Sequence, residues 1–280
     1  MTRETLIVAL GDRRYAVERN WAKLAAGQEF GFLSDVAVDS KGVVHVGQRT
    51  DTPMMAFGPD GKFIRSWGNG EIADVHGVSA TADGRVLVTD RDAHQIQIYD
   101  TQGRRQVVLG ERHNPQLQAP FNHPTSTAVA PDGDIYVSDG YGNSVVHRFA
   151  ADGRLKRTWG GRGAGPGEFT TPHAVWIDSR NRILVADREN NRVQIFDRDG
   201  AYLAEWTDFY HPMAIYGDDR GMIYVTDQIP RISMLSLDGE LIGRCRGTLN
   251  GAHGMSGDRD GNFYLSELPP EKITRLALLG

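Results

Sequence analysis

Residues 172–200 read PHAVWIDSRNRILVADRENNRVQIFDRDG. Three short apolar runs rich in β-branched residues are separated by a turn at Arg180-Asn181 and by a polar segment that follows Asp187. Such runs, bounded by turn residues, are typical of β-strands. A second turn at Asp199-Gly200 leads into a further run that closes at Trp206. The stretch therefore predicts consecutive strands joined by tight turns.

The same unit recurs along the chain. Its first turn carries a Gly, or an Asn in one copy, which supplies the positive φ of a tight hairpin. These residues are Gly42, Gly84, Gly133, Asn181, Gly221 and Gly261, spaced 40 to 49 residues apart. The second turn recurs at Asp60-Gly61, Gln102-Gly103, Asp152-Gly153, Asp199-Gly200 and Asp238-Gly239. This period suits a four-stranded propeller blade. The sequence predicts an all-β fold, one six-bladed β-propeller domain over residues 1–280.

The sixth copy of the unit is incomplete, because the chain ends after residues 272–279 without a second turn or fourth strand. Near the N-terminus, residues 14–21 read RYAVERNW, which is similar to GKFIRSW at residues 61–67. We expect residues near Tyr15 to Trp21 to form the outer strand of the last blade. A ring closed in this way leaves no long unpaired strand edge.

Composition narrows the function classes. The formal net charge is −5 and there is no run of Lys or Arg, which argues against a nucleic-acid partner. Cys245 is the only cysteine, so no intrachain disulfide can form and a reducing compartment is expected. The apolar stretch from Leu6 to Leu10 is too short for a signal peptide or a membrane span. The protein is expected to begin near Met1 in the cytoplasm, without a membrane partner; the sequence leaves the oligomeric state open.

Histidines share one position of the repeat. Eight residues before each first-turn residue stand Ser34, His76, Thr125, His173, Met213 and His253. Histidine therefore occupies blades two, four and six, which lie about 120° apart around a six-fold channel. Three imidazoles converging there are typical of a zinc site with an open position. Copper, nickel, iron or manganese would also suit these ligands, and the alternative is that the histidines bond to neighbouring backbone.

Two further histidines, His123 and His211, stand two residues before the shared position, and each precedes a proline. We expect turn residues here, with lining of the channel mouth as the alternative.

The loops after the second strand of each blade are expected to overlook one channel mouth. Tyr141 lies there between two glycines, where a core aromatic is not expected, so a functional phenol and a structural role are both open. Arg49 and Arg188 are candidates to clamp a carboxylate, with surface ion pairing as the alternative. The strand-end carboxylates are interpreted as turn caps or arginine partners, and Arg192 as a scaffold arginine. These carboxylates are Asp90, Asp139, Asp187 and Asp227.

Several of these segments carry a resemblance to a known family. The strings HGV at residues 76–78, SDGYGNS at 138–144, PHAV at 172–175 and ADREN at 186–190 resemble NHL-repeat propellers. More narrowly, they are similar to the lyase domain of the peptide α-amidating enzymes, the peptidyl-α-hydroxyglycine α-amidating lyase. The similarity runs through all six blades, and the DGYxNS string together with the phased histidines is its most specific part.

This resemblance implies a set of roles. His76, His173 and His253 would bind catalytic zinc, Tyr141 would act near the metal, and Arg49 and Arg188 would orient the substrate. The family reaction splits the carbinol C–N bond of an α-hydroxyglycine and gives an amide and glyoxylate.

The chain departs from the family in two respects. Where the family has an Asp that helps to hold a structural calcium, Gly254 follows His253, which speaks against calcium. The family's disulfides are also impossible here. These departures favour a small-molecule substrate over secreted peptides.

The sequence therefore predicts a metal-dependent lyase, with zinc as the expected metal, that acts on a small α-hydroxy or carbinolamide-type carboxylate in the central channel. The alternatives are a hydrolase or hydratase at the same site and a non-catalytic NHL module that binds protein or RNA. A calcium-dependent lactonase-type propeller is less favoured, because it would need carboxylates where this channel offers imidazoles.

Overall fold

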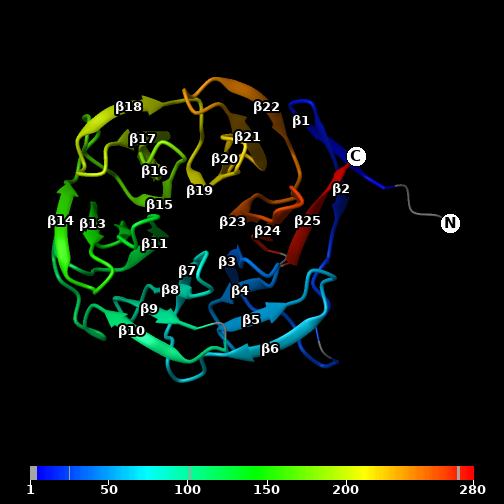
Figure 1. Ribbon diagram of the computed structural model, residues 1–280, viewed down its shortest axis with the longest axis horizontal. Helices are drawn as coiled ribbons and strands as arrows, with labels where there is room; N and C mark the ends of the chain where they lie inside the picture. The colour runs from blue at the N-terminus through cyan, green and yellow to red at the C-terminus, as the bar shows by residue number, and fades with distance from the viewer. Residues whose placement is uncertain (1–4, 25, 101, 270–271) are drawn as a thin grey trace.

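The computed structural model describes residues 5–24, 26–100, 102–269 and 272–280. Within these residues, six antiparallel sheets form a ring around a central channel (Figure 1). Five sheets have four strands and one has five. The predicted six-bladed β-propeller is confirmed.

Each blade runs from an inner strand at the channel to an outer strand at the rim. Blade one comprises β3 (Leu33–Val38), β4 (Val44–Gln48), β5 (Met54–Phe57) and β6 (Phe63–Trp67). Blade two comprises β7 (Val75–Ala80), β8 (Val86–Asp90), β9 (Gln95–Tyr99) and β10 (Arg105–Leu109). Blade three comprises β11 (Pro124–Val129), β12 (Ile135–Asp139), β13 (Val145–Phe149) and β14 (Leu155–Gly160).

The remaining blades follow the same order. Blade four comprises β15 (Pro172–Ile177), β16 (Ile183–Asp187), β17 (Arg192–Phe196) and β18 (Tyr202–Trp206), with the short 3-10 helix η1 (Arg188–Asn190) after β16. Blade five comprises β19 (Pro212–Gly217), β20 (Ile223–Asp227), β21 (Arg231–Leu235) and β22 (Leu241–Cys245). Blade six comprises β23 (Ala252–Gly257), β24 (Phe263–Glu267), β25 (Lys272–Leu279), β2 (Arg13–Glu18) and β1 (Ile7–Leu10).

The predicted turns have the backbone conformation that their residues suggest. All six first-turn residues have positive φ, from 59° at Asn181 to 89° at Gly133. The five second-turn glycines also have positive φ, between 74° and 86°. The repeat is therefore held in register by residues that accept the left-handed region at low cost.

The N-terminus closes the ring as predicted, but with different bounds. The outer strand of blade six is β2, which pairs with β25 and ends at Glu18, before Trp21. The side chain of Trp21 instead packs edge-on against Tyr264, with ring centroids 4.8 Å apart. A fifth strand, β1, which the sequence analysis did not predict, pairs with β2 through a turn at Gly11. The repeat offered no counterpart for β1, because no other blade has a fifth strand.

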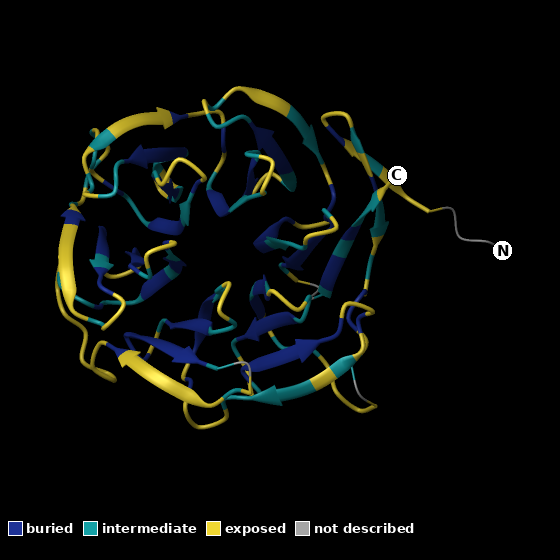
Figure 2. Cartoon of the chain, viewed as in Figure 1, coloured by how far each residue is buried: buried dark blue, intermediate teal, exposed yellow. Residues whose placement is uncertain are grey.

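The hydrophobic core lies between neighbouring blades. Inner strands are buried, whereas the outer strands β10, β14 and β18 are largely exposed (Figure 2). Between blades three and four, Trp159 and Phe169 pack against Phe196 with ring centroids 6.0 and 5.6 Å away. Burial of each such side chain stabilises the fold by about 1.5–3 kcal/mol. These interfaces hold the inner strands at fixed positions around the channel.

Candidate metal centre

The three phased histidines occupy the same position on their inner strands. His76, His173 and His253 are the second residues of β7, β15 and β23. At each histidine the pairing with the next strand shifts register, so the histidine has no partner residue in that antiparallel pair. Bulges of this kind bend a strand and redirect one side chain, and they occur often beside functional sites.

The three rings meet on the channel axis. Ring centroids are 4.9 Å apart for His76–His173, 4.9 Å for His76–His253 and 5.0 Å for His173–His253. One nitrogen from each ring lies within 4.8 Å of the others, and all three side chains are buried. This cluster can hold a metal ion.

Backbone hydrogen bonds fix the orientation of each ring. The Nδ1 atom lies 2.6 Å from the Thr125 carbonyl in His76, 2.7 Å from the Met213 carbonyl in His173 and 2.7 Å from the Ser34 carbonyl in His253. These acceptors are the three non-histidine members of the same repeat position. A carbonyl only accepts, so each Nδ1 carries the proton and each Nε2 presents a lone pair.

The Nε2 atoms are the nitrogens left for a ligand. Among the described residues, buried Nε2 of His173 has no hydrogen-bond partner. An unpaired buried acceptor is costly, and a metal ion would satisfy it. The backbone alternative for these histidines is thus observed at Nδ1, and it is compatible with a metal at Nε2, which stays a prediction.

The pKa values of the three histidines favour the neutral form. Burial, followed by the neighbouring charge of Arg49, lowers the pKa of His253 to about 3. Burial and the other two imidazoles lower the pKa of His76 well below its usual range, and burial with His253 does the same for His173. Neutral imidazoles are the form that binds transition metals. The donor set suits zinc and its neighbours rather than calcium, which takes oxygen ligands.

Tyr141 packs against two histidines of the cluster, with ring centroids 5.0 Å from His76 and 5.9 Å from His173. Its phenol oxygen is 3.0 Å from Nε2 of His76 and accepts a hydrogen bond of 3.2 Å from Nη1 of Arg188. The side chain is 38% exposed, so it faces both the histidines and the channel mouth. Close packing around Gly140 leaves no room for a side chain, because a Cβ there would lie 2.1 Å from the Pro172 carbonyl oxygen.

The arginines around Tyr141 include one that the sequence analysis missed. Arg188 also pairs with Glu189 at 2.8 Å, and its guanidinium lies 5.3 Å from the Tyr141 ring centroid. The guanidinium of Arg91 lies 5.8 Å from the same centroid. Arg49 stacks over Phe32 at 5.1 Å. Arg49 and Arg188 thus have acidic and aromatic neighbours, and their binding of a carboxylate stays a prediction.

The position of Arg91 in the repeat could have identified it from the sequence. Arg49, Arg91 and Arg188 each directly follow the last residue of the second strand of their blade. Asp74 lies between two of them, 3.7 Å from Arg49 and 3.1 Å from Arg91. Burial raises the pKa of Asp74 to about 6 although both arginines oppose the shift.

The strand-end carboxylates have the structural role that was expected. Asp90, Asp139, Asp187 and Asp227 accept hydrogen bonds from backbone or side-chain groups of the adjoining loops. Arg192 pairs with Asp187 at 2.9 Å as a scaffold arginine.

The other two histidines of interest lie on the loops, as expected for turn residues. His123 has φ 59° and packs edge-on against His94. His211 has φ 48°, stacks on Tyr210 and reaches Glu189 with its Nε2 at 3.3 Å. His211 therefore contacts the carboxylate that holds Arg188.

The space beside Gly254 is filled by a carboxylate from another blade. Asp35, next to Ser34 on β3, accepts the backbone N–H groups of Val36 and Val78, each at 2.8 Å. A Cβ on Gly254 would lie 2.0 Å from Oδ1 of Asp35. Burial raises the pKa of Asp35 to about 7. No local pattern predicts that these two residues meet, because they lie on blades one and six.

Comparison with known proteins agrees with this architecture. A family model described as 6-bladed beta-propeller matches residues 126–234, and an NHL repeat model matches residues 73–99. The fold and its repeats thus define an NHL-type six-bladed propeller. A probable peptidyl-alpha-hydroxyglycine alpha-amidating lyase from Caenorhabditis elegans is 34% identical over 238 residues, covering 78% of this chain and 68% of that protein. The chain belongs to the family of that probable amidating lyase.

A further relative matches a shorter part of the chain. Human NHL repeat-containing protein 3 is 35% identical over 191 residues, covering 62% of this chain and 55% of that protein. The chain thus spans 55% and 68% of the length of these two relatives.

Solved structures share the fold. A gluconolactonase from Xanthomonas campestris has a TM-score of 0.72 at 17% identity, with 96% of this chain and 91% of that chain covered. An inactive virginiamycin B lyase from Staphylococcus aureus has a TM-score of 0.67 at 20% identity, with 92% and 84% covered. In the described part of the chain, no helix has the length and apolar character needed to cross a membrane.

Proposed function

We propose that this protein is a metal-dependent lyase that cleaves the carbinol C–N bond of a small α-hydroxy-α-amido carboxylate. The observation that carries the proposal is the convergence of three neutral imidazoles beside the phenol of Tyr141. The kinship with a probable amidating lyase supports the reaction type. The reaction yields an amide and an α-oxo acid, with no water consumed.

His76, His173 and His253 would hold the metal through their Nε2 atoms, and zinc suits this donor set best. A bound divalent metal supplies Lewis-acid chemistry, which lowers the pKa of a hydroxyl group placed on it. The protein holds the three imidazole rings in fixed orientations, because each ring donates a hydrogen bond through Nδ1 to a carbonyl of a neighbouring blade.

The arginines of the channel mouth would bind the substrate carboxylate. Three arginines lie close enough to the candidate metal centre for their charges to help lower the pKa of His253: Arg49, Arg91 and Arg188. Their acidic partners, Asp74 and Glu189, hold the guanidinium groups in place. Guanidinium groups bind carboxylates through paired hydrogen bonds, which fixes the orientation as well as the charge.

Tyr141 would move the proton. As phenolate, it takes the proton of the substrate hydroxyl; the C–O electrons then form the carbonyl, the C–N bond breaks, and the departing nitrogen takes the proton back from the phenol. Arg188 donates to the phenol oxygen and so stabilises the negative charge on it. This cleavage is balanced without water or any other added reactant, because the proton taken from the hydroxyl returns to the departing nitrogen.

The test is a direct assay of glyoxylate release from N-acetyl-α-hydroxyglycine by the zinc-loaded protein. We expect enzyme-dependent release of glyoxylate and acetamide in equal amounts. The matched control is Arg157→Gln, which changes an exposed arginine of β14 on the rim. Absence of turnover on this and on other small carbinolamide carboxylates, with the metal bound, would contradict the lyase assignment. A hydratase or hydrolase activity on other substrates at the same site would then be the remaining enzymatic alternative.

A further inference from the structure

The channel has a second end whose chemistry is opposite to that of the arginine mouth. The inner strands run from the arginine mouth to the first turns, and a cavity of about 570 Å³ opens between the histidine cluster and those turns. Its volume is within the range of small-molecule sites. No Lys or Arg lines this cavity within the described residues.

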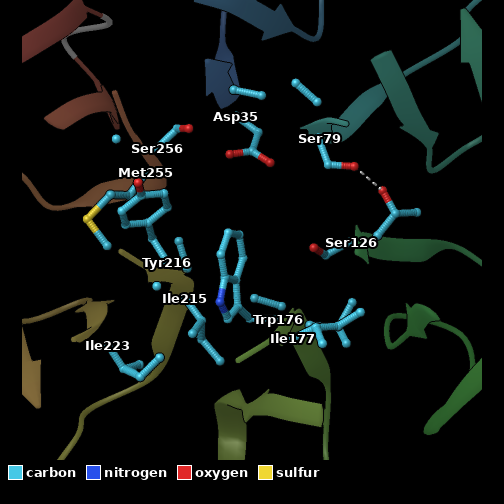
Figure 3. A pocket seen from close by; sticks show the side chains of 18 of the residues that line it. Asp35, Ser79, Ser126, Trp176, Ile177, Ile215, Tyr216, Ile223, Met255 and Ser256 are labelled. Carbon is cyan, nitrogen blue, oxygen red and sulfur yellow. Dashed lines mark hydrogen bonds between the residues drawn. The ribbon is translucent and has the colours of Figure 1, made fainter. Parts of the chain in front are cut away.

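Two aromatic side chains form one wall of the cavity. Trp176 and Tyr216 lie on the neighbouring inner strands β15 and β19, with ring centroids 5.3 Å apart (Figure 3). Trp176 is three residues beyond His173, which places it about 10 Å further along the strand. Both side chains line the cavity and are only partly buried.

Carboxylates supply the charge of the cavity. Asp178 is neutralised by Arg182 at 2.7 Å and Asp218 by Arg13 at 3.0 Å. In the described part of the chain, Asp35 in the wall and Asp219 at the rim have no ion pair. Asp35 points into the open space opposite Trp176 (Figure 3).

Acidic side chains lie near the aromatic wall. Burial, and then the charges of Asp218, Asp219 and Asp258, raise the pKa of Tyr216 to about 12. Asp35 accepts two backbone N–H groups and burial raises its pKa to about 7, so a neighbouring cation would favour its ionised form; aromatic faces attract cations within about 6 Å.

We propose that this cavity is a binding site for a small organic ammonium ion, separate from the metal centre. The charged nitrogen lies between the Asp35 carboxylate and the faces of Trp176 and Tyr216. The apolar substituents contact aliphatic side chains of the inner strands such as Ile177 and Ile215. Anionic substrate and cationic ligand thus meet opposite ends of one channel. This site does not depend on the proposed lyase reaction.

The experiment compares choline with its uncharged carbon analogue, 3,3-dimethylbutan-1-ol, by calorimetric titration of the zinc-loaded protein at constant ionic strength. We expect saturable choline binding at least about tenfold tighter than that of the alcohol, which corresponds to ~1.4 kcal/mol. Trp176→Leu and Asp35→Asn should each weaken choline binding by about tenfold or more. Asp152→Asn, on an exposed turn of blade three, is the matched control and should bind as the parent does.

Several results would overturn the proposal. Equal affinity for choline and the alcohol would remove the role of charge, and unchanged affinity in Trp176→Leu would remove the aromatic wall. Abolition of choline binding by sodium or magnesium at equal ionic strength would assign the site to an inorganic cation. If Asp35→Asn fails to fold, the exposed Asp219→Asn replaces it, with an expected loss of about twofold; no loss there contradicts the proposal.

Discussion

The phenol oxygen of Tyr141 lies 3.0 Å from Nε2 of His76. Because Nδ1 of His76 donates to the Thr125 carbonyl, its Nε2 has no proton, and the phenol is the donor in this contact. A metal on that nitrogen would take the lone pair and free the phenol oxygen, which must lose its proton before it can act as the base of the proposed reaction. The contact thus joins the candidate metal ligand to the candidate acid–base group.

Replacing Tyr141 by Phe should abolish proton transfer while leaving the metal ligands intact. We expect kcat for glyoxylate release to fall by about 10²–10⁴-fold. Metal content, measured in parallel, should stay unchanged. Tyr210→Phe is the matched control, because Tyr210 is also exposed on a loop and its neighbour is His211 rather than a histidine of the cluster. Full activity in Tyr141→Phe would exclude the assigned role.

Replacing Arg91 by Gln should weaken the hold on the substrate carboxylate. Arg91 lies beside Tyr141 and is held by Asp74, so its loss removes one positive charge from the mouth. We expect KM to rise about tenfold with a smaller change in kcat. Steady-state kinetics measure this, with Arg157→Gln as control. An unchanged KM would mean that Arg91 serves only its ion pairs with Asp74 and with the neighbouring Asp92, which lies 2.8 Å away.

Acid should destabilise the metal-free protein through its buried histidines. The folded-state pKa of His253 is about 3, whereas the unfolded histidine titrates near its usual 6.5. The unfolded state therefore binds more protons between these values, and stability that is full above pH 6.5 is lost progressively as the pH falls towards 3. The slope is up to about 1.4 kcal/mol per pH unit for each such group. Urea unfolding of EDTA-treated protein at pH 7, 6 and 5 measures this slope, which should be smaller in His253→Gln. Equal slopes in the two proteins would contradict the pKa assignment.

Replacing Gly254 by Ala should destabilise the fold. The new Cβ would lie 2.0 Å from Oδ1 and 2.7 Å from the Cα of Asp35, so relief requires backbone movement. We expect a loss of about 1–3 kcal/mol in the free energy of unfolding. Gly161→Ala is the control, since a Cβ there meets no atom within 4 Å. If the two variants are equally stable in urea, the close approach of blades one and six at this point is wrong.

Most of the fold and the histidine cluster could be predicted from the sequence repeat. Turn residues such as Gly133 and Asn181 set the blade period, and counting back from them placed His76, His173 and His253 at one depth. This worked because a propeller converts a constant sequence offset into a constant position on the channel wall. The same count, applied to the residue after each second strand, would also have found Arg91.

Other structural features could not be predicted, because they depend on contacts between blades rather than on the local sequence. The strand β1 lies outside the repeat, so its pairing with β2 depends on which edge the closed ring leaves free. The approach of Asp35 to Gly254 joins residues 219 positions apart and is set by how blades one and six pack. The hydrogen bonds from the histidines to Thr125, Met213 and Ser34 depend likewise on interblade geometry rather than on any residue type.

The most direct test of the central claim is the metal content of the purified protein after incubation with zinc and gel filtration. We expect about one equivalent of tightly bound zinc in the parent protein and in His113→Ala, an exposed histidine outside the cluster, and its loss in His173→Ala. A parent protein that retains no transition metal, or a His173→Ala variant that binds zinc as tightly as the parent, would contradict it.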